Sequence, residues 1–326
     1  MRSRLILIAL FATSFAALAS MQTPHRQRLN PVITLLEQNK PVFGLYAPSN
    51  RRFGRGGAPA AEAPPPKPAS ELAKEAIAYP SSDFIFDGTM EGGVDKGLPA
   101  FTEFVDALKQ ATAENRALRL QHPLIVKTEK IAPNFAKAVD NIGRELNVGT
   151  SGIMFVETES ADEVRQGLAA MRFKAKGGTR SDNVGMAPAY WGMSEQEYKA
   201  KADLWPLNPD GELVNWTIVE SKEGLAHVRE IAAVKGIGVL WPGAGTLRGV
   251  FTTTNAAGER VFDEKGWEGA IQQVLAACKE FHVPCGYPAN ANDIEMRMKQ
   301  GFSVFVMNWG DPGFKAIEIG RKVAGR

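Results

Sequence analysis

The chain has 326 residues, with 38 Lys and Arg against 36 Asp and Glu, so its formal net charge at pH 7 is +2. This near balance gives no reason to expect nucleic acid as a partner. Without its N-terminal segment the chain is about 300 residues long, enough for one large α/β barrel or two ordinary domains.

The first 19 residues have the pattern of a secretory signal peptide. Arg2 and Arg4 form a basic start, residues 5–18 are apolar, and Ala17-Leu18-Ala19 has the small-x-small pattern of a cleavage site. The apolar stretch is too short for a stable membrane anchor. We therefore expect a secreted or periplasmic protein with no membrane attachment after cleavage, a polar lead over residues 20–29, and a single domain over residues 30–326.

From residue 30 onward, short apolar segments alternate with segments of helical period. Asn30 and Pro31 have the cap and first-turn pattern of a helix start, and that helix precedes the first strand. The expected strands are 41–47, 84–87, 123–127, 152–157, 213–220, 236–241, 283–287 and 302–307. Continuous apolar strands alternating with helices imply a parallel sheet buried on both faces. Eight of them imply an α/β fold of the closed (β/α)8 TIM barrel type.

Two segments interrupt this alternation. Residues 49–69 are rich in Gly, Ala and Pro, which predicts a flexible loop inserted early in the barrel. Residues 172–212 form a polar and aromatic excursion. The aromatic residues in and beside it are Tyr190, Trp191, Tyr198, Trp205 and Trp216. They either roof the barrel mouth and contact a ring-bearing substrate, or pack against a neighbouring subunit, and we favour packing.

Glu220 is the first candidate for a functional residue. It ends the strand 213–220, and a helix start follows at Ser221. An α/β barrel carries its chemistry at the carboxyl ends of its strands. A carboxylate there suits a hard divalent ion such as Mg²⁺ or Mn²⁺. The alternative is a helix cap or a solvated loop acid, because acids are common at helix starts.

Several segments together carry a resemblance to a known family. They are Phe84-Ile-Phe-Asp87-Gly88, Ser160-Ala-Asp-Glu163, Arg172-Phe173 with Gly178-Thr-Arg180 and Gly185, Ile218-Val-Glu220-Ser-Lys-Glu223, and Gly286-Tyr-Pro-Ala-Asn290. In this order and spacing the chain resembles the HpcH/HpaI aldolase and citrate lyase family, the metal-dependent pyruvate aldolases. The resemblance runs from about residue 30 to residue 323, apart from 49–69, and it too implies a (β/α)8 barrel.

The resemblance implies a divalent metal held by a Glu, an Asp and the bound 2-oxo acid, where the ion stabilises the pyruvate enolate. Glu220 matches the first metal ligand. Lys127 stands where the family has an Arg, so it can neutralise a carboxylate but without a bidentate fork. After Asp87-Gly88 the family has Glu-His, and here Thr89 and Met90 stand there. Glu91 is the nearest substitute for the missing proton-transfer His.

The second metal ligand is also missing. The family's Gly-Pro-Ala-Asp-Leu corresponds to the stretch Trp241-Pro242-Gly243-Ala244-Gly245-Thr246-Leu247, which has no carboxylate. Glu157, at the end of the fourth strand, is the candidate replacement, although it is equally placed to cap the next helix. Backbone N–H groups at residues Gly243, Ala244, Gly245 and Thr246 can bind a carboxylate. Tight turning alone also explains these glycines.

The leading hypothesis is a carbon–carbon lyase that resembles class II pyruvate aldolases and cleaves a 2-oxo or 3-hydroxy acid with a modified Mg²⁺ or Mn²⁺ site. Its substrate is a small-molecule carboxylate. A Schiff base on Lys127 is another route to an enamine. The alternatives are a non-catalytic small-molecule-binding barrel, or an enzyme of another class on the same fold.

Two features concern assembly and compartment. Related barrels commonly form hexamers by exchanging the last helix, so residues 317–323 lead us to expect a homo-oligomer. Cys278 and Cys285 can pair in an oxidising compartment, unless their positions on a helix and the next strand point them apart.

Overall fold

The computed structural model describes residues 28–49, 66–132 and 134–326. The predicted signal peptide, most of the polar lead and most of the 49–69 loop lie outside these residues. Among the described helices, none combines the length and the apolar character needed to cross a membrane.

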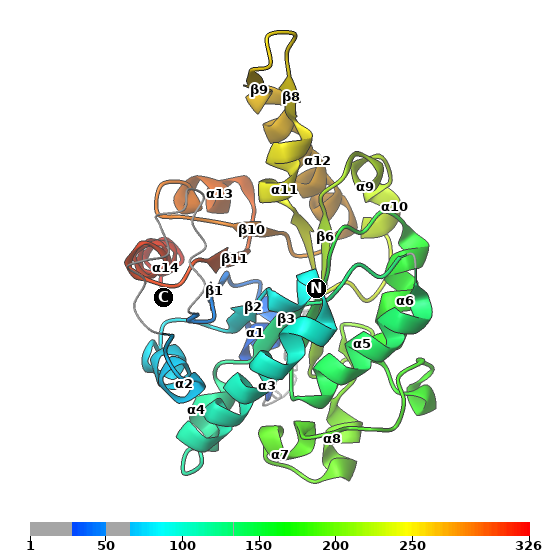
Figure 1. The fold of residues 1–326 in the computed structure, drawn as a ribbon, viewed down its shortest axis with the longest axis vertical. Coiled ribbons are helices and arrows are strands. Elements are labelled where there is room, and N and C mark those ends of the chain that lie inside the picture. Colours follow the sequence, from blue (N-terminus) through cyan, green and yellow to red (C-terminus); the bar gives the residue numbers. More distant parts are fainter. Residues whose placement is uncertain (1–27, 50–65, 133) are drawn as a thin grey trace, which may run out of the picture.

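Eight parallel strands form a closed barrel (Figure 1). They are β1 (Val42–Tyr46), β2 (Ile85–Asp87), β3 (Leu124–Lys127), β4 (Gly152–Phe155), β6 (Leu213–Val219), β7 (Val239–Pro242), β10 (Gly286–Pro288) and β11 (Val304–Met307). The ring closes between β7 and β10, where Leu240 bridges Cys285 and its N–H donates to the carbonyl of Pro284 at 2.9 Å. The (β/α)8 TIM barrel predicted from the sequence is confirmed, and all eight strands lie within the predicted segments or one residue beyond them.

Helices surround this barrel. They are α1 (Pro31–Glu37), α2 (Ala69–Ala78), α3 (Val94–Ala111), α4 (Arg116–Leu120), α5 (Phe135–Asn147), α6 (Ala161–Met171), α7 (Ala187–Trp191), α8 (Glu195–Lys201), α9 (Lys222–Ala226), α10 (Val228–Ala232), α11 (Ala244–Val250), α12 (Glu264–Phe281), α13 (Ile294–Gln300) and α14 (Asp311–Val323). Two short 3₁₀ turns, η2 (Thr89–Gly92) and η3 (Lys174–Lys176), join them. The last helix, α14, packs on β1, β11 and α13 of its own chain.

The alternation of side chains along each strand divides the core into two parts. Ile125 points into the barrel, whereas its neighbours Leu124 and Val126 pack against the surrounding helices. Large aromatic rings fill the interior, and glycines on neighbouring strands make room for them. A Cβ at Gly44 would lie 2.3 Å from the Phe84 ring, and a Cβ at Gly286 would lie 2.1 Å from Trp241.

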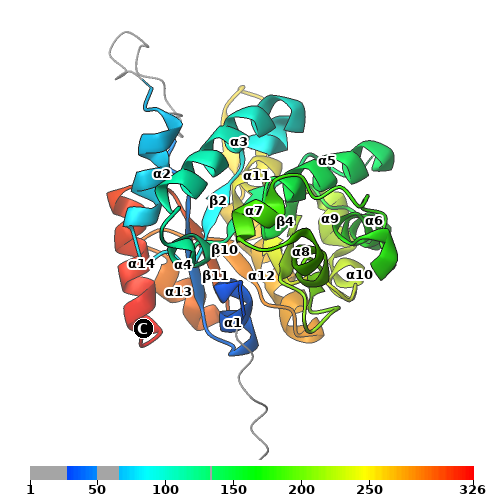
Figure 2. The same cartoon turned by 90° about the horizontal axis from the view of Figure 1, so that it is seen from below.

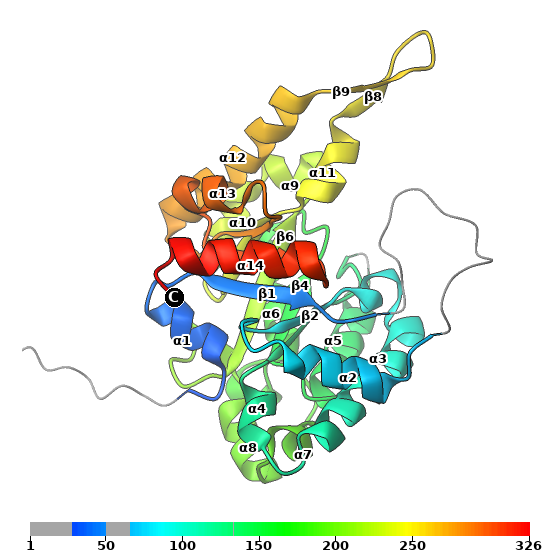
Figure 3. The same cartoon turned by 90° about the vertical axis from the view of Figure 1, so that its left-hand side faces the viewer.

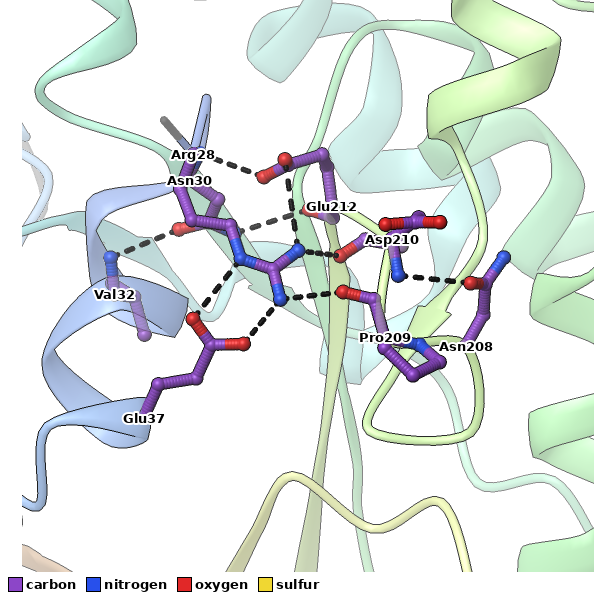
Figure 4. A network of polar contacts seen from close by, with 9 residues as sticks. Arg28, Asn30, Val32, Glu37, Asn208, Pro209, Asp210 and Glu212 are labelled. Atoms are coloured by element: carbon purple, nitrogen blue, oxygen red, sulfur yellow. Dashed lines mark hydrogen bonds and ion pairs between the residues drawn. The ribbon is translucent and has the colours of Figure 1, made fainter. Parts of the chain in front are cut away.

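Helix α1 covers the amino-terminal end of the barrel and is fastened there by a polar network (Figure 4). Asn30 caps α1 by accepting the N–H of Val32, and its own N–H donates to the buried Glu212 at 3.0 Å. Arg28 donates to the carbonyl of Gly211 at 3.0 Å and pairs with Glu37. Because Glu212 directly precedes β6, this network fixes the start of the strand whose other end leads to Glu220.

The excursion at 172–212 packs within the chain rather than over the barrel mouth. It contains α7, α8 and the two-residue strand β5 (Leu204–Trp205), which pairs with the first residues of β6. Trp191 donates its indole N–H to the carbonyl of Gly149 at 2.9 Å, and the Tyr198 hydroxyl donates to Leu146. Seen from below, α7 and α8 lie nearest the viewer (Figure 2). Trp191 and Tyr198 thus pack on α5 and the loop after it in the same chain, and the expected contact with a neighbouring subunit stays a prediction.

Two elements were not predicted, and one open question about the cysteines is resolved. The unpredicted elements are helix α2, which follows the Pro-rich segment, and a hairpin of β8 (Thr252–Thr254) and β9 (Arg260–Phe262). The hairpin projects beyond the barrel at the end opposite α7 and α8 (Figures 1 and 3). Cys278 and Cys285 form a disulfide with a Cα–Cα distance of 5.7 Å. Their side chains converge because His282 adopts a left-handed conformation that turns the chain back after α12.

Candidate active site

A cavity of about 190 Å³ lies at the carboxyl ends of the barrel strands. The predicted Lys127, Glu220 and residues 243–246 all line it, so the structure brings these separate segments together. The rest of the lining consists of Tyr46, Phe86, Met154, Ile218, Trp241, Pro242, Pro288 and Val306. The cavity therefore combines two charged groups and a phenol with an apolar wall.

Lys127 is the last residue of β3 and its side chain is 15% exposed. Its ammonium lies 2.9 Å from the Glu91 carboxylate. Burial alone would lower the pKa of Lys127, but Tyr46, Glu91 and Glu220 act in the opposite direction and leave its pKa above the ordinary value. Lys127 is therefore an ammonium ion at neutral pH, suited to bind an anion. A Schiff base would need the neutral amine.

Tyr46 ends β1 beside Lys127, and the sequence analysis did not select it. Both side chains pass over Gly88, where a Cβ would lie 3.4 Å from the Tyr46 ring and 3.7 Å from Lys127 Cδ. Burial raises the pKa of Tyr46, and the nearby acids Glu91, Asp87 and Glu220 add to the rise, although Lys127 opposes it. The phenol is therefore protonated at neutral pH, and Tyr46 lines the cavity.

Glu220 lies directly after β6 and is 3% exposed. Its Oε1 accepts the backbone N–H of Glu157 at 3.0 Å. The cap of the following helix α9 is Ser221, whose hydroxyl accepts the N–H of Gly224. The helix-cap reading of Glu220 is therefore excluded. A Cβ at Gly243 would lie 2.3 Å from Glu220 Cβ and 2.6 Å from Oε2, so the glycine makes room for this carboxylate.

The carboxylate of Glu157 does not meet that of Glu220. Glu157 has a φ of +47°, its side chain is 53% exposed, and its Oε2 lies 3.4 Å from Lys130 Nζ. It contributes its backbone N–H to the site and directs its carboxylate away. It does not cap α6 either, because the hydroxyl of Ser160 does so. The two proposed metal ligands are thus not brought together.

Glu91 and the turn at residues 243–246 also differ from their expected roles. Glu91, on the η2 turn, reaches the site only through its ion pair with Lys127. The N–H of Gly243 donates to the carbonyl of Val219 at 2.8 Å, so it is not available to a ligand. The N–H groups of residues 244–246 belong to the first turn of α11 and have no acceptor within that helix.

The residues at the cavity are poorly suited to hold Mg²⁺ or Mn²⁺. Among the described residues that line the cavity, Glu220 is the only acid, and one of its oxygens already accepts an N–H. The Lys127 ammonium also faces this space, where it would repel a cation. Over residues 28–49, 66–132 and 134–326, no group of three or more His, Cys, Asp or Glu is arranged to hold a metal. These residues do not fit the two-carboxylate centre that the resemblance implies.

Solved structures with the same fold are known, whereas searches by sequence found no match. No family model matches the sequence, and no curated protein matches it. Among solved structures, an HpcH/HpaI aldolase/citrate lyase family protein from Burkholderia cenocepacia J2315 is similar to it, with 20% identity, a TM-score of 0.62, and 91% of this chain and 98% of that chain covered.

Two further structures are similar over most of the chain. The HpcH/HpaI aldolase from Desulfitobacterium hafniense DCB-2 has 14% identity and a TM-score of 0.59, covering 90% of this chain and 95% of that one. Macrophomate synthase has 17% identity and a TM-score of 0.58, covering 96% of this chain and 95% of that one. The resemblance found in the sequence is thus confirmed in the fold: the chain has the barrel of the HpcH/HpaI aldolase/citrate lyase structures.

Proposed function

We propose that this protein is a carbon–carbon lyase that acts on a small 2-oxo acid. The observation that carries the proposal is the pair of opposite charges, Lys127 from β3 and Glu220 after β6, at one cavity on the catalytic face of the barrel. The fold shared with HpcH/HpaI aldolase structures supports the same reaction class, although a shared fold alone does not fix an activity.

The geometry supports a cleavage of the aldol type. In a 4-hydroxy-2-oxo acid, Glu220 accepts the proton of the C4 hydroxyl, the C3–C4 bond breaks and an aldehyde leaves. The electron pair moves into the C2 carbonyl and forms an enolate. The Lys127 ammonium faces both the carboxylate and this developing oxyanion, and the Tyr46 phenol is placed to donate a hydrogen bond to it. A proton added at C3 then converts the enolate into the second product, which is a 2-oxo acid. The reaction therefore needs no oxidant or reductant.

In this proposal Lys127 supplies the positive charge that the resemblance assigns to a divalent ion. The described donor set does not fit that ion, and no step is routed through it. A lyase of this kind would keep its activity in a buffer that contains a metal chelator.

A screen of 4-hydroxy-2-oxo acids, with aldehyde release as the signal, tests the proposal. Loss of one oxyanion-stabilising group typically lowers kcat by about 10²–10³-fold, which is the loss we expect for Lys127→Met. Lys127→Arg is the matched control: it keeps the charge and cannot form a Schiff base, so it should retain most of the activity. If Lys127→Arg were inactive and borohydride trapped substrate on the wild type, the ammonium role would be wrong.

A non-catalytic binding barrel is the second candidate. The observation that favours it is the joint replacement of the family's His, Arg and second carboxylate by Met90, Lys127 and residues 245–246. It predicts that the wild type binds a 2-oxo acid in a Lys127-dependent manner but releases no aldehyde from any substrate in the screen.

A further inference from the structure

The proposed bond cleavage uses the charged side of the cavity and leaves its apolar wall unexplained. This wall consists of Phe86, Met154, Ile218, Trp241 and Val306. Each of these side chains is at most 6% exposed and belongs to the apolar interior of the barrel. A ligand with only an oxo acid headgroup would leave the apolar side of the cavity unfilled. Apolar surface at a ligand site is normally matched by apolar surface on the ligand.

Trp241 is the largest part of the wall, and the fold holds it in one position. A Cβ at Gly286, on the next strand of the barrel, would lie 2.1 Å from Trp241 Cε2. The Trp216 ring packs on it from below, with a centroid distance of 5.1 Å. The Trp241 indole is therefore held in place by its neighbours, with a ring against which an aromatic group can stack.

The size of the cavity fits a ring. A protein cavity of about 150 Å³ is known to hold benzene, and this cavity measures about 190 Å³. One six-membered ring and a short acid headgroup would fill it. Pyruvate alone would not.

We propose that the substrate is an aryl-substituted 2-oxo acid, with its ring against Trp241 and the rest of the apolar wall and its carboxylate at Lys127. The position of the carboxylate rests on the proposed function, whereas the position of the ring rests on the wall alone. Substrate selection would then lie in Trp241 and its neighbours, and the bond-breaking step in Lys127 and Glu220.

The test is calorimetric titration of the wild-type protein with phenylpyruvate and with pyruvate, which share the oxo acid and differ in the ring. Even a single methylene in an apolar pocket changes selection by about 10-fold or more, so we expect phenylpyruvate to bind at least about 10-fold more tightly. Equal affinities, tighter binding of pyruvate, or no binding of either compound would overturn the inference.

Two variants locate the two ends of the ligand. Trp241→Phe should reduce the preference for phenylpyruvate and leave pyruvate binding nearly unchanged, with thermal unfolding as the check of folding. Lys127→Met should weaken both ligands. If phenylpyruvate is preferred but Lys127→Met has no effect, the aryl site stands and the proposed role of Lys127 fails. If Lys127→Met weakens both ligands equally and no preference exists, the aryl site fails and the proposed function stands.

Discussion

Lys127 is kept positively charged by the groups around it, and this determines how ligand binding should depend on pH. Its pKa lies above the ordinary value because Tyr46, Glu91 and Glu220 outweigh the effect of burial. The charged form is therefore present throughout the neutral range and is lost only as pH rises through that raised pKa.

The affinity for a 2-oxo acid should accordingly stay constant from about pH 7 to pH 9 and fall at higher pH. Glu91→Gln removes one of the groups that raise the pKa of Lys127, so it should move this fall to lower pH. Titrations of both proteins across this range check the prediction. An affinity that rises with pH would indicate that the neutral amine is the binding form.

Gly243 and Gly245 both line the cavity, and substituting each by alanine tests whether the space at Gly243 is needed by Glu220. A Cβ at Gly243 would lie 2.6 Å from Glu220 Oε2, whereas a Cβ at Gly245 would meet nothing within 4 Å. Gly243→Ala should destabilise the fold by about 1–3 kcal/mol and impair the site, because Glu220 has to move. Gly245→Ala should leave stability unchanged or raise it by up to about 1 kcal/mol, since alanine is the better helix former. Chemical denaturation of both variants measures the difference.

Glu145 provides a second pH-dependent prediction, this time for stability. It is fully buried in α5, and neither of its carboxylate oxygens has a well-formed hydrogen bond. The nearby hydroxyl of Thr128 acts to lower its pKa, but burial has the larger effect. Burial raises the pKa of Glu145 well above its ordinary value. For an acid with a raised folded-state pKa, the folded state is favoured at low pH, and this advantage is lost as pH rises from the unfolded-state pKa to the folded-state pKa.

Glu145→Gln should therefore stabilise the protein relative to wild type at neutral pH. The expected gain is about 1.4 kcal/mol for each pH unit by which the pH exceeds the unfolded-state pKa, up to the folded-state pKa. The difference should vanish near pH 4. Unfolding curves at pH 4 and pH 7 test it, and a variant that is less stable than wild type at both pH values would contradict it.

At the scale of elements, the disulfide ties the end of α12 to the start of β10, the strand that closes the barrel against β7. It spans a sequence separation of 7 residues. The loop-entropy estimate for so short a loop is about 2–3 kcal/mol. The double substitution Cys278→Ser and Cys285→Ser should lower the free energy of unfolding by about this amount, and a denaturant titration measures it. An unchanged free energy of unfolding would mean that the bond does not constrain the unfolded chain.

The sequence predicted elements well where their apolar pattern was continuous, and poorly where it was not. The eight barrel strands are short apolar runs, which is why their segments could be identified. The hairpin consists of Thr252–Thr254 and Arg260–Phe262, whose mixed pattern resembles a loop. Helix α2 begins at Ala69, where the Pro-rich segment ends, and no helix was predicted between this segment and the second strand.

The candidate site could be predicted only in part, for a geometric reason. Glu220 was found because a charged residue at a strand end stands out, and Lys127 because it stands where the resembling family has an Arg. Tyr46 and Trp241 lie inside apolar runs, and their inward direction follows from strand register, which the sequence does not specify. Glu157 ends its strand in the same way as Glu220, but its positive φ turns its carboxylate outward.

At the scale of the whole molecule, the two ends of the barrel have different roles. The network of Arg28, Asn30 and Glu212 fastens α1 across the amino-terminal end (Figure 4). The opposite end carries the cavity, and the projecting hairpin extends from the helix that follows β7 (Figure 3). We propose that the chain is exported, and the disulfide supports this, since such bonds persist in oxidising compartments. Assembly into a homo-oligomer through residues 317–323 stays a prediction.

The central claim is that Lys127, rather than a divalent metal, supplies the positive charge that binds the oxo acid. It is tested most directly by titrating wild type, Lys127→Met and Lys127→Arg with a 2-oxo acid in a buffer containing a metal chelator, and then with Mg²⁺ or Mn²⁺ restored. Wild type and Lys127→Arg should bind the 2-oxo acid without metal, and Lys127→Met should not. Binding that requires the metal, depends on Glu220 and survives Lys127→Met would contradict it.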